Sequence, residues 1–172
     1  ELRSRVADLA ETARRTGRMT QQLLSMEKAR GREGADKWAM LDLRRPLEEI
    51  ACRFAEREMR HGVSVSFVTT GPAQPVMADP VMLYEAVENL LDNARRYGCP
   101  EGGEVELSLS FNQDQVAIRV TDSGPGIPAD VHERVFDRFF RLSNDASGGC
   151  GLGLSIVRKV AEAHGGTARV VD

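Results

Sequence analysis

Two asparagines spaced four residues apart, Asn89 and Asn93, are the first side chains in this sequence whose types and spacing suggest chemistry. In a helix this spacing places both amides on one face. An asparagine carbonyl oxygen is a hard, neutral ligand that suits Mg²⁺, and this ion takes most of its remaining ligands from water and phosphates. Arg96 and Tyr97 follow, and they could pair with a phosphate and cover the face of a base. Taken alone, an asparagine pair of this spacing is more often two exposed surface amides.

A carboxylate stands where a strand is expected to end, because Asp122 directly precedes the run SGPGIP. Held there, it could accept a hydrogen bond from the exocyclic amine of adenine, whereas guanine would present a carbonyl oxygen instead. A hydrogen bond to a charged partner contributes about 1.5–3 kcal/mol, so this one contact could select the base. Gly124 and Gly126 would let the backbone approach the ring or adopt positive φ. On its own, a DxGxG run after a strand is more often only a turn.

A glycine-rich run, GGCGLGLSIV, places Gly149, Gly151 and Gly153 before and inside the first turn of an expected helix. Free backbone amides and the helix dipole at such a place can cradle phosphate. No Gly-Lys-Ser/Thr follows, so the run is not a P-loop, and no βαβ unit with a ribose-binding acid surrounds it. From the glycines alone, a phosphate-binding turn and a plain turn are about equally supported.

Between these segments, residues 128–148 are mostly loop-like and carry phenylalanines interleaved with arginines. A glycine-flanked segment with anchors in its middle can close over a ligand as a lid. A short amphipathic helix that packs its phenylalanines on the core is an alternative compatible with that role. The residues concerned are Phe136, Arg138, Phe139, Phe140 and Arg141.

These groups must be positioned by the surrounding elements, which the sequence patterns predict. Asp79 caps a helix whose first residue is Pro80 and whose buried stripe runs to Ala94. Helices in one block against a largely antiparallel sheet favour a two-layer α/β sandwich with a mixed, mostly antiparallel sheet. The other expected elements are a helix over 42–60, a strand over 63–68, a hairpin of strands 104–111 and 115–122, a helix over 152–164 and a strand over 168–171.

The first 30 residues read as one long helix, because Leu2, Leu9 and Leu23 belong to a seven-residue repeat with a polar, Arg-rich back. An ordinary amphipathic helix docked on its own domain is the alternative. Residues 31–40 then read as a linker, with Trp38 packing at the junction rather than binding a ligand, and residues 41–172 form the main domain.

The bulk properties narrow the class of protein. A formal net charge of -3 gives no electrostatic case for nucleic-acid binding. Cys52, Cys99 and Cys150 fit neither a disulfide framework nor a zinc spacing, which favours a reducing cytoplasm. No apolar run is long enough to cross a bilayer, although the chain can still be the soluble piece of a longer membrane protein. The histidines, His61, His132 and His164, are expected to be solvated surface groups.

Four segments in order, ENLLDNARRYG, VTDSGPGIP, VFDRFFR and GGCGLGLSIV, resemble the N box, first glycine box, F box and second glycine box of sensor histidine kinases. That family shares the Bergerat-type ATP-binding fold with gyrase-type, mismatch-repair and heat-shock chaperone ATPases. The resemblance covers roughly residues 41–172, and the preceding helix resembles the second helix of the family's dimerisation and phosphotransfer hairpin.

The resemblance implies an ATP site with Mg²⁺. Asn93 would be the metal ligand, Asn89 its phosphate-side neighbour and Arg96 a phosphate contact. Asp122 would recognise adenine. The nucleotide pocket would also include Tyr97, Gly124, Gly126, Ile127, the lid residues Phe136, Arg138 and Phe139, and the phosphate-side residues Gly149, Gly151, Leu152, Gly153 and Leu154.

The implied reaction is transfer of the γ-phosphoryl group of ATP to a histidine and then to an aspartate of a response regulator. Hydrolytic relatives carry a glutamate four residues before the metal-binding asparagine, where this chain has Asn89; Glu88 is one residue earlier and rotated about 100° around the helix. This difference favours phosphotransfer. An anti-sigma-type serine kinase, a related ATPase and a non-catalytic nucleotide-binding regulator stay as alternatives.

Three departures from the family pattern shape the expectation. The family's phosphoacceptor histidine is absent, so we expect this chain alone not to autophosphorylate and its hairpin to come from elsewhere, in a membrane-anchored homodimer of the bacterial inner membrane. Cys150 stands where Thr or Ser is usual, and packing is its expected role. The chain also stops short of the family's final strands.

Overall fold

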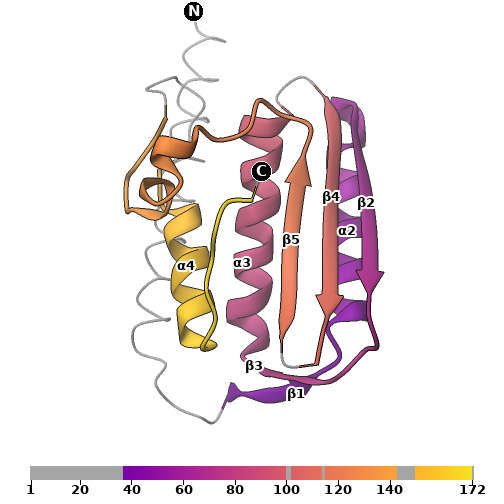
Figure 1. The fold of residues 1–172 in the computed structure, drawn as a ribbon. Helices are drawn as coiled ribbons and strands as arrows, with labels where there is room; N and C mark the ends of the chain where they lie inside the picture. The colour runs from indigo at the N-terminus through magenta and orange to yellow at the C-terminus, as the bar shows by residue number, and fades with distance from the viewer. Residues whose placement is uncertain (1–36, 100–101, 114, 143–149, 172) are drawn as a thin grey trace, which may run out of the picture.

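The computed structural model describes residues 37–99, 102–113, 115–142 and 150–171 (Figure 1). The long helix expected over residues 1–30 and the linker residues up to 36 lie outside the described residues. The described elements are β1 (Ala39–Leu41), α2 (Arg44–Glu58), β2 (Val63–Thr70), β3 (Val76–Ala78), α3 (Pro80–Asn93), a π-helical turn (Ala94–Gly98), β4 (Gly103–Phe111), β5 (Val116–Asp122) and α4 (Gly153–Ala163), with short 3₁₀ turns at Met59–His61, Ala129–Val131 and Arg134–Phe136.

Helix α3 begins where the sequence predicts. The Asp79 carboxylate accepts from the backbone N–H groups of Val81 and Met82 at 2.9 and 3.2 Å, and Pro80 takes the first helical position, where its missing N–H costs nothing. This cap fixes the start of the helix, and therefore the direction in which every later side chain of α3 points.

The main sheet has the strand order β2-β4-β5. Strands β2 and β4 run parallel, with Val65 opposite Val105, and β4 and β5 form the predicted antiparallel hairpin, with Leu107 opposite Val120. Helices α2, α3 and α4 lie on one face of this sheet (Figure 1). The predicted two-layer α/β sandwich with a mixed sheet is therefore confirmed.

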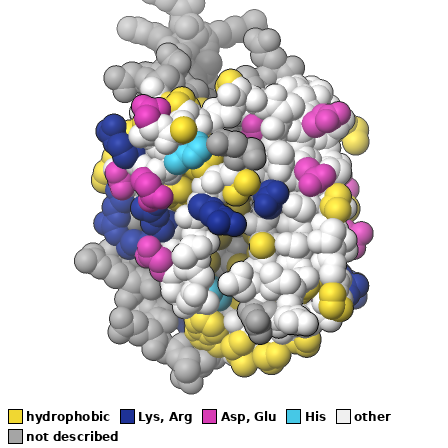
Figure 2. All heavy atoms as spheres, in the orientation of Figure 1, with side chains coloured by type: hydrophobic (Ala, Val, Ile, Leu, Met, Phe, Trp, Pro, Cys, Tyr) yellow, Lys and Arg dark blue, Asp and Glu magenta, His cyan; other side chains and the backbone are white. Residues whose placement is uncertain are grey.

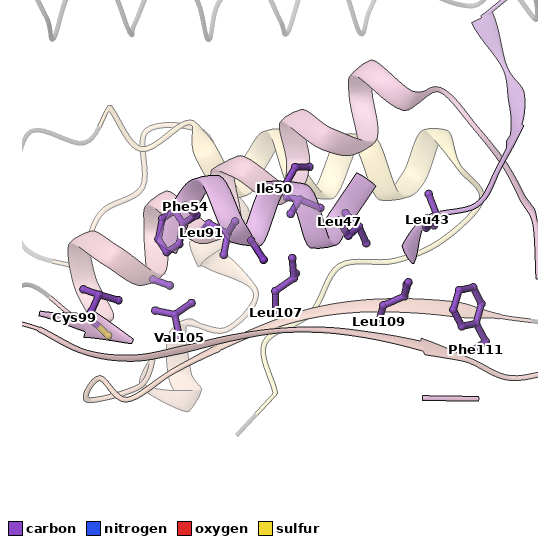
Figure 3. Packing of buried hydrophobic residues seen from close by; sticks show 14 residues of the cluster. Leu43, Leu47, Ile50, Phe54, Leu91, Cys99, Val105, Leu107, Leu109 and Phe111 are labelled. Atoms are coloured by element: carbon purple, nitrogen blue, oxygen red, sulfur yellow. The ribbon is translucent and has the colours of Figure 1, made fainter. Parts of the chain in front are cut away.

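The core forms between the α2–α3 layer and the inward face of β4 (Figure 3). Alternate residues of β4 point to the helices, as a strand with one buried face requires. The fully buried members include Leu47 of α2, Leu91 of α3 and Leu107 and Leu109 of β4. Because Leu91 is held in this core, the opposite side of α3, which carries Asn89 and Asn93, is directed toward α4.

Two features differ from the sequence-based expectation. A second sheet of two short strands, β1 and β3, begins inside the segment expected to be a linker and pairs Met40 with Met77, both half exposed. The strand expected over residues 168–171 is wrong: among the described residues this segment has no strand partner, and its Val170 packs under the segment before α4 instead. None of the described helices has the length and apolar character of a bilayer-spanning segment.

Candidate functional site

The two asparagines lie on the α4 side of α3, both partly buried. The Nδ2 of Asn89 donates to the backbone carbonyl of Glu85 at 2.9 Å, one turn earlier, and this bond orients the amide. Its Oδ1 then lies beside Gly153, where a Cβ would be only 3.1 Å away. The amide oxygen of α3 thus meets the first residue of α4 at a point where no side chain intervenes.

A π-helical turn extends α3 and directs the next residues of the site. Cys99 donates its N–H to the carbonyl of Ala94 at 2.8 Å, which closes the wider turn. Arg95 pairs with Glu58 of α2 at 2.8 Å and also donates to the carbonyl of Cys99 at 2.9 Å, so it braces the turn. Arg96, by contrast, is half buried and has no hydrogen-bond or ion-pair partner among the described residues, while Tyr97 is 42% exposed.

The Glu58 carboxylate beneath this turn is nearly buried but ionised. Burial acts to raise its pKa, but the hydrogen bonds and the positive charges of Arg57 and Arg95 outweigh burial and lower that pKa below its ordinary 4.5. Arg95 is therefore structural, and of these two neighbouring arginines Arg96 is the one available to a ligand.

Asp122 lies at the end of β5, against the end of the π-helical turn. Its Oδ1 accepts from the N–H of Gly124 at 3.0 Å, so one carboxylate oxygen is held by the following turn. The same oxygen and the Cγ of Asp122 lie over Gly98, where any Cβ would overlap the Asp122 side chain. Asp122 itself is exposed, and Gly126 adopts a φ of 74°, as the sequence suggested.

The glycine-rich turn contacts the aromatic segment before it. Phe139 donates its N–H to the carbonyl of Gly151 at 2.7 Å, and a Cβ at Gly151 would lie 2.7–2.8 Å from backbone atoms of Phe139 and Phe140. Both residues adopt positive φ, 66° at Phe139 and 67° at Gly151. Phe139 is 60% exposed, so its ring is presented at the surface beside this turn.

The rest of this segment is anchored on α4 by aromatic and basic side chains. Figure 2 shows Lys and Arg side chains gathered on the side of α4 and the segment before it, next to acidic ones. Arg158 of α4 lies 4.6 Å over the ring of Phe136 and donates to the Glu133 carboxylate at 2.9 Å. The buried Phe136 packs with Val131 and Val135, and Leu154 and Ile127 pack against them. Phe136 thus packs on the core, as the alternative to a lid expected, whereas Phe139 and Arg138 stay exposed.

The site residues therefore form two groups joined by α3. Asn89, Gly153 and the Gly151 turn make one group, and Asp122, Gly124 and the end of the π-helical turn make the other. Gly98 follows Asn89 by nine positions, which corresponds to roughly 13 Å along a helix axis. Leu152 is buried beneath the glycine turn, Cys150 packs against the same cluster, and Gly149 lies outside the described residues.

The donor set fits a magnesium ion that is shared with a ligand. Among the described residues no cluster of three or more His, Cys, Asp or Glu side chains could hold a metal on its own. Asn89 Oδ1 lies beside side-chain-free Gly153, and such neutral amide oxygens suit an ion that takes its other ligands from phosphates and water.

The family model of histidine kinase-, DNA gyrase B- and HSP90-like ATPases matches residues 78–172, more than half of the chain. The chain belongs to this family. This match begins just before the Asp79 cap and includes α3, the π-helical turn, the β4–β5 hairpin and α4, so every element of the two site groups falls within the ATPase match.

The chain is similar to sensor histidine kinases. It is 31% identical to sensor protein IrlS of Burkholderia pseudomallei over 99% of this chain and 36% of the relative. Full-length ShkA in complex with AMPPNP has a TM-score of 0.81 at 26% identity, over 99% of this chain and 35% of that one. Histidine kinase ThkA, in complex with response regulator protein TrrA, has a TM-score of 0.63 at 27% identity, over 77% and 37%. The chain thus spans about a third of the length of these proteins.

Sequence reasoning missed the role of Gly98 in the candidate site and the contacts of two histidines around it. Gly98 faces Asp122, but the sequence offered only its position after a helix as a signal. His164 was expected to be solvated, and this is wrong: its Nε2 accepts from the N–H of Asp79 at 3.1 Å, and its Nδ1 lies 2.7 Å from the carbonyl of Val160. Its ring also lies 4.7 Å from that of Trp38, which packs on this histidine at the start of α3 and the end of α4. His132 is half buried and bonded to Ile127, so the expectation was wrong there too.

Proposed function

We propose that this chain is the ATP-binding catalytic part of a sensor histidine kinase. The observation that carries the proposal is that the two site groups lie at different points along α3 and its π-helical extension. Asn89 meets the start of α4, where backbone amides favour phosphate. Asp122 contacts Gly98, which lies roughly 13 Å further along the same helical path, and this spacing suits the distance between the base and the phosphates of a nucleotide. The family match and the neighbour that contains AMPPNP support the same nucleotide.

Each residue has a role in this proposal. The free oxygen of Asp122 accepts from the exocyclic amine of adenine, and Tyr97 covers the base. Arg96 neutralises phosphate charge, while the N–H groups from Gly151 to Leu154 cradle the phosphates. Asn93, with Asn89 beside it, would hold Mg²⁺, which supplies charge neutralisation across the β- and γ-phosphates when it is bound. The protein then contributes position and electrostatics rather than a nucleophile.

The chemistry at Asn89 supports transfer rather than hydrolysis. A hydrolytic site needs a base that takes a proton from water, and an amide is not one. The neighbouring carboxylate, Glu88, is exposed, whereas Asn89 is directed toward Gly153. We therefore infer that the γ-phosphoryl group goes to a protein side chain.

Titration with a non-hydrolysable ATP analogue, with and without Mg²⁺, tests the nucleotide site. Asn93→Ala should remove most of the Mg²⁺-dependent gain in affinity, roughly tenfold or more. Asp122→Ala should weaken binding about tenfold to a hundredfold in either condition, because it removes a hydrogen bond to a charged group. Glu88→Gln, on the exposed side of the same helix, is the matched control and should leave the affinity unchanged. Unchanged affinity in both site variants would overturn the assignment.

The phosphate acceptor is proposed to be a histidine on a dimerisation hairpin, with onward transfer to the aspartate of a response regulator. Relatives named as sensor proteins, and the ThkA complex with response regulator protein TrrA, support transfer to a response regulator. The membrane-anchored homodimer is part of the same proposal. Incubating this chain with labelled Mg-ATP should leave it unlabelled, and adding a histidine-bearing hairpin should give acid-labile phosphate on the hairpin. Acid-stable phosphoserine on a partner protein would instead support the anti-sigma-type kinase.

A further inference from the structure

The structure assigns Gly98 as a positioning residue for adenine recognition: its missing side chain leaves the space that the Asp122 carboxylate occupies. This inference rests on the proposed role of Asp122 and adds the residue that determines where its carboxylate lies. A Cβ built on Gly98 would overlap the Cγ and Oδ1 of Asp122 and would lie 2.6 Å from its Cβ. These are its three nearest neighbours, so the space at Gly98 is filled by one side chain.

Gly98 has to be a glycine because a side chain would not fit there, not because of its backbone angles. Gly98 does not belong to the glycines with positive φ, so an L-residue could adopt its backbone angles without strain. Gly124 completes the same interlock from the other side. A Cβ there would overlap the Cα of Gly98 and lie 2.8 Å from both the Gly98 carbonyl oxygen and Asp122 Oδ1. The carboxylate thus lies between two glycines from different elements.

Neither side of this contact can move easily. On the α3 side, the Cys99 N–H bond to Ala94 closes the π-helical turn, and Arg95 ties the turn to Glu58 and to the carbonyl of Cys99. The backbone of Gly98 is therefore fixed by the hydrogen bonds of Cys99 and Arg95 on the same turn.

On the β5 side, Ser123 and Glu104 are joined by two hydrogen bonds. The Ser123 N–H donates to the Glu104 carbonyl at 3.1 Å, and the Glu104 N–H donates to Ser123 Oγ at 3.0 Å. Because Asp122 directly precedes Ser123, its Cα is fixed, and only rotation of the carboxylate could relieve an added methyl group. That rotation would break the bond from Gly124 and turn the acceptor away from the base.

The test compares ADP with purine riboside 5′-diphosphate, which differs only in lacking the exocyclic amine. Their affinity ratio, measured by calorimetry, isolates the contact to Asp122, and a purely structural defect would weaken both ligands alike. The wild-type chain should prefer ADP about tenfold to a hundredfold. Gly98→Ala should reduce this preference to within about threefold of unity while the analogue loses much less affinity. Gly166→Ala is the matched control, since its Cβ would meet an atom only at 3.4 Å, and it should keep the wild-type ratio.

The outcomes separate the two proposals. A wild-type ratio near one would overturn the adenine role of Asp122 and this inference with it. A wild-type preference that persists in folded Gly98→Ala would overturn only the role of Gly98. If Gly98→Ala does not fold, the double variant Gly98→Ala with Asp122→Gly removes the overlapping side chain and should recover a cooperative thermal transition. Failure of that double variant to fold, when Asp122→Gly alone folds, would also overturn the inference.

Discussion

The Nε of Arg95 donates to Oε2 of Glu58 at 2.8 Å, and this ion pair joins the π-helical turn after α3 to the end of α2. Glu58 is only 7% exposed, and Arg57 pairs with its other oxygen at 2.8 Å. Since Arg95 also holds the carbonyl of Cys99, the pair supports the turn on which Gly98 faces Asp122. The stability of this junction and the recognition of the base are thus linked.

Arg95→Met should lower the free energy of unfolding by about 2 kcal/mol, because it leaves a nearly buried carboxylate with one of its two cations. Chemical denaturation measures this loss. Arg45→Met is the control, since the Arg45–Glu49 pair is exposed and such helix pairs contribute about 0.3–0.5 kcal/mol. Equal losses in the two variants would contradict the role given to the Glu58 pair.

The Glu58 pair also predicts a pH dependence. Its pKa is lowered from 4.5 in the folded chain, because the two arginines outweigh the effect of burial. A lowered folded pKa gives stability that is fully present above the unfolded pKa and is lost as the pH falls through the folded one. The difference in unfolding free energy between wild type and Glu58→Gln should therefore be constant from neutral pH down to about pH 5 and shrink below pH 4.5. A difference that stays constant to pH 3 would argue against this contribution.

The sequence predicted the elements whose signals are local. Asp79 and Pro80 specified the start of α3, and alternation over residues 104–122 specified the β4–β5 hairpin, because caps and period-two patterns act between near neighbours. Strands β1 and β3 were missed because three residues are too few for a pattern. Residues 168–171 include two valines that favour a strand, but pairing depends on a partner strand that local pattern cannot supply.

The candidate site was predictable in composition more than in geometry. Asn89, Asp122 and the glycines carry recognisable chemistry, so their grouping could be proposed from order alone. The roles of Arg95, Gly98 and His164 depend on contacts with residues 37, 24 and 85 positions away, namely Glu58, Asp122 and Asp79. No local pattern indicates such contacts, which explains why the structural role of Arg95 was not predicted from the sequence.

Gly151→Ala should weaken binding of the ATP analogue and destabilise the chain. The φ of 67° is costly for an L-residue, about 1–2 kcal/mol, and the added methyl group would also press on the backbone of Phe139 and Phe140. Gly165→Ala isolates the first effect, because Gly165 has a φ of 71° but no atom within 4 Å of its would-be Cβ. Thermal melting should show a loss in both variants, and calorimetry should show a loss of affinity in Gly151→Ala alone. Equal affinities would contradict a role for the Gly151–Phe139 contact in binding.

His164→Phe should loosen the junction where α3 begins and α4 ends. The Asp79 N–H would lose its acceptor, which costs about 1–3 kcal/mol for a buried group, although the ring contact to Trp38 could persist. Trp38 is the one tryptophan of the sequence, so its emission reports this junction directly. Its spectrum should change in His164→Phe, and the denaturation midpoint should fall, whereas His61→Phe at an exposed helix end should alter neither. Because α4 begins at Gly153 beside Asn89, the same variant should also bind the ATP analogue more weakly. An unchanged emission spectrum together with unchanged stability would show that His164 does not hold this junction.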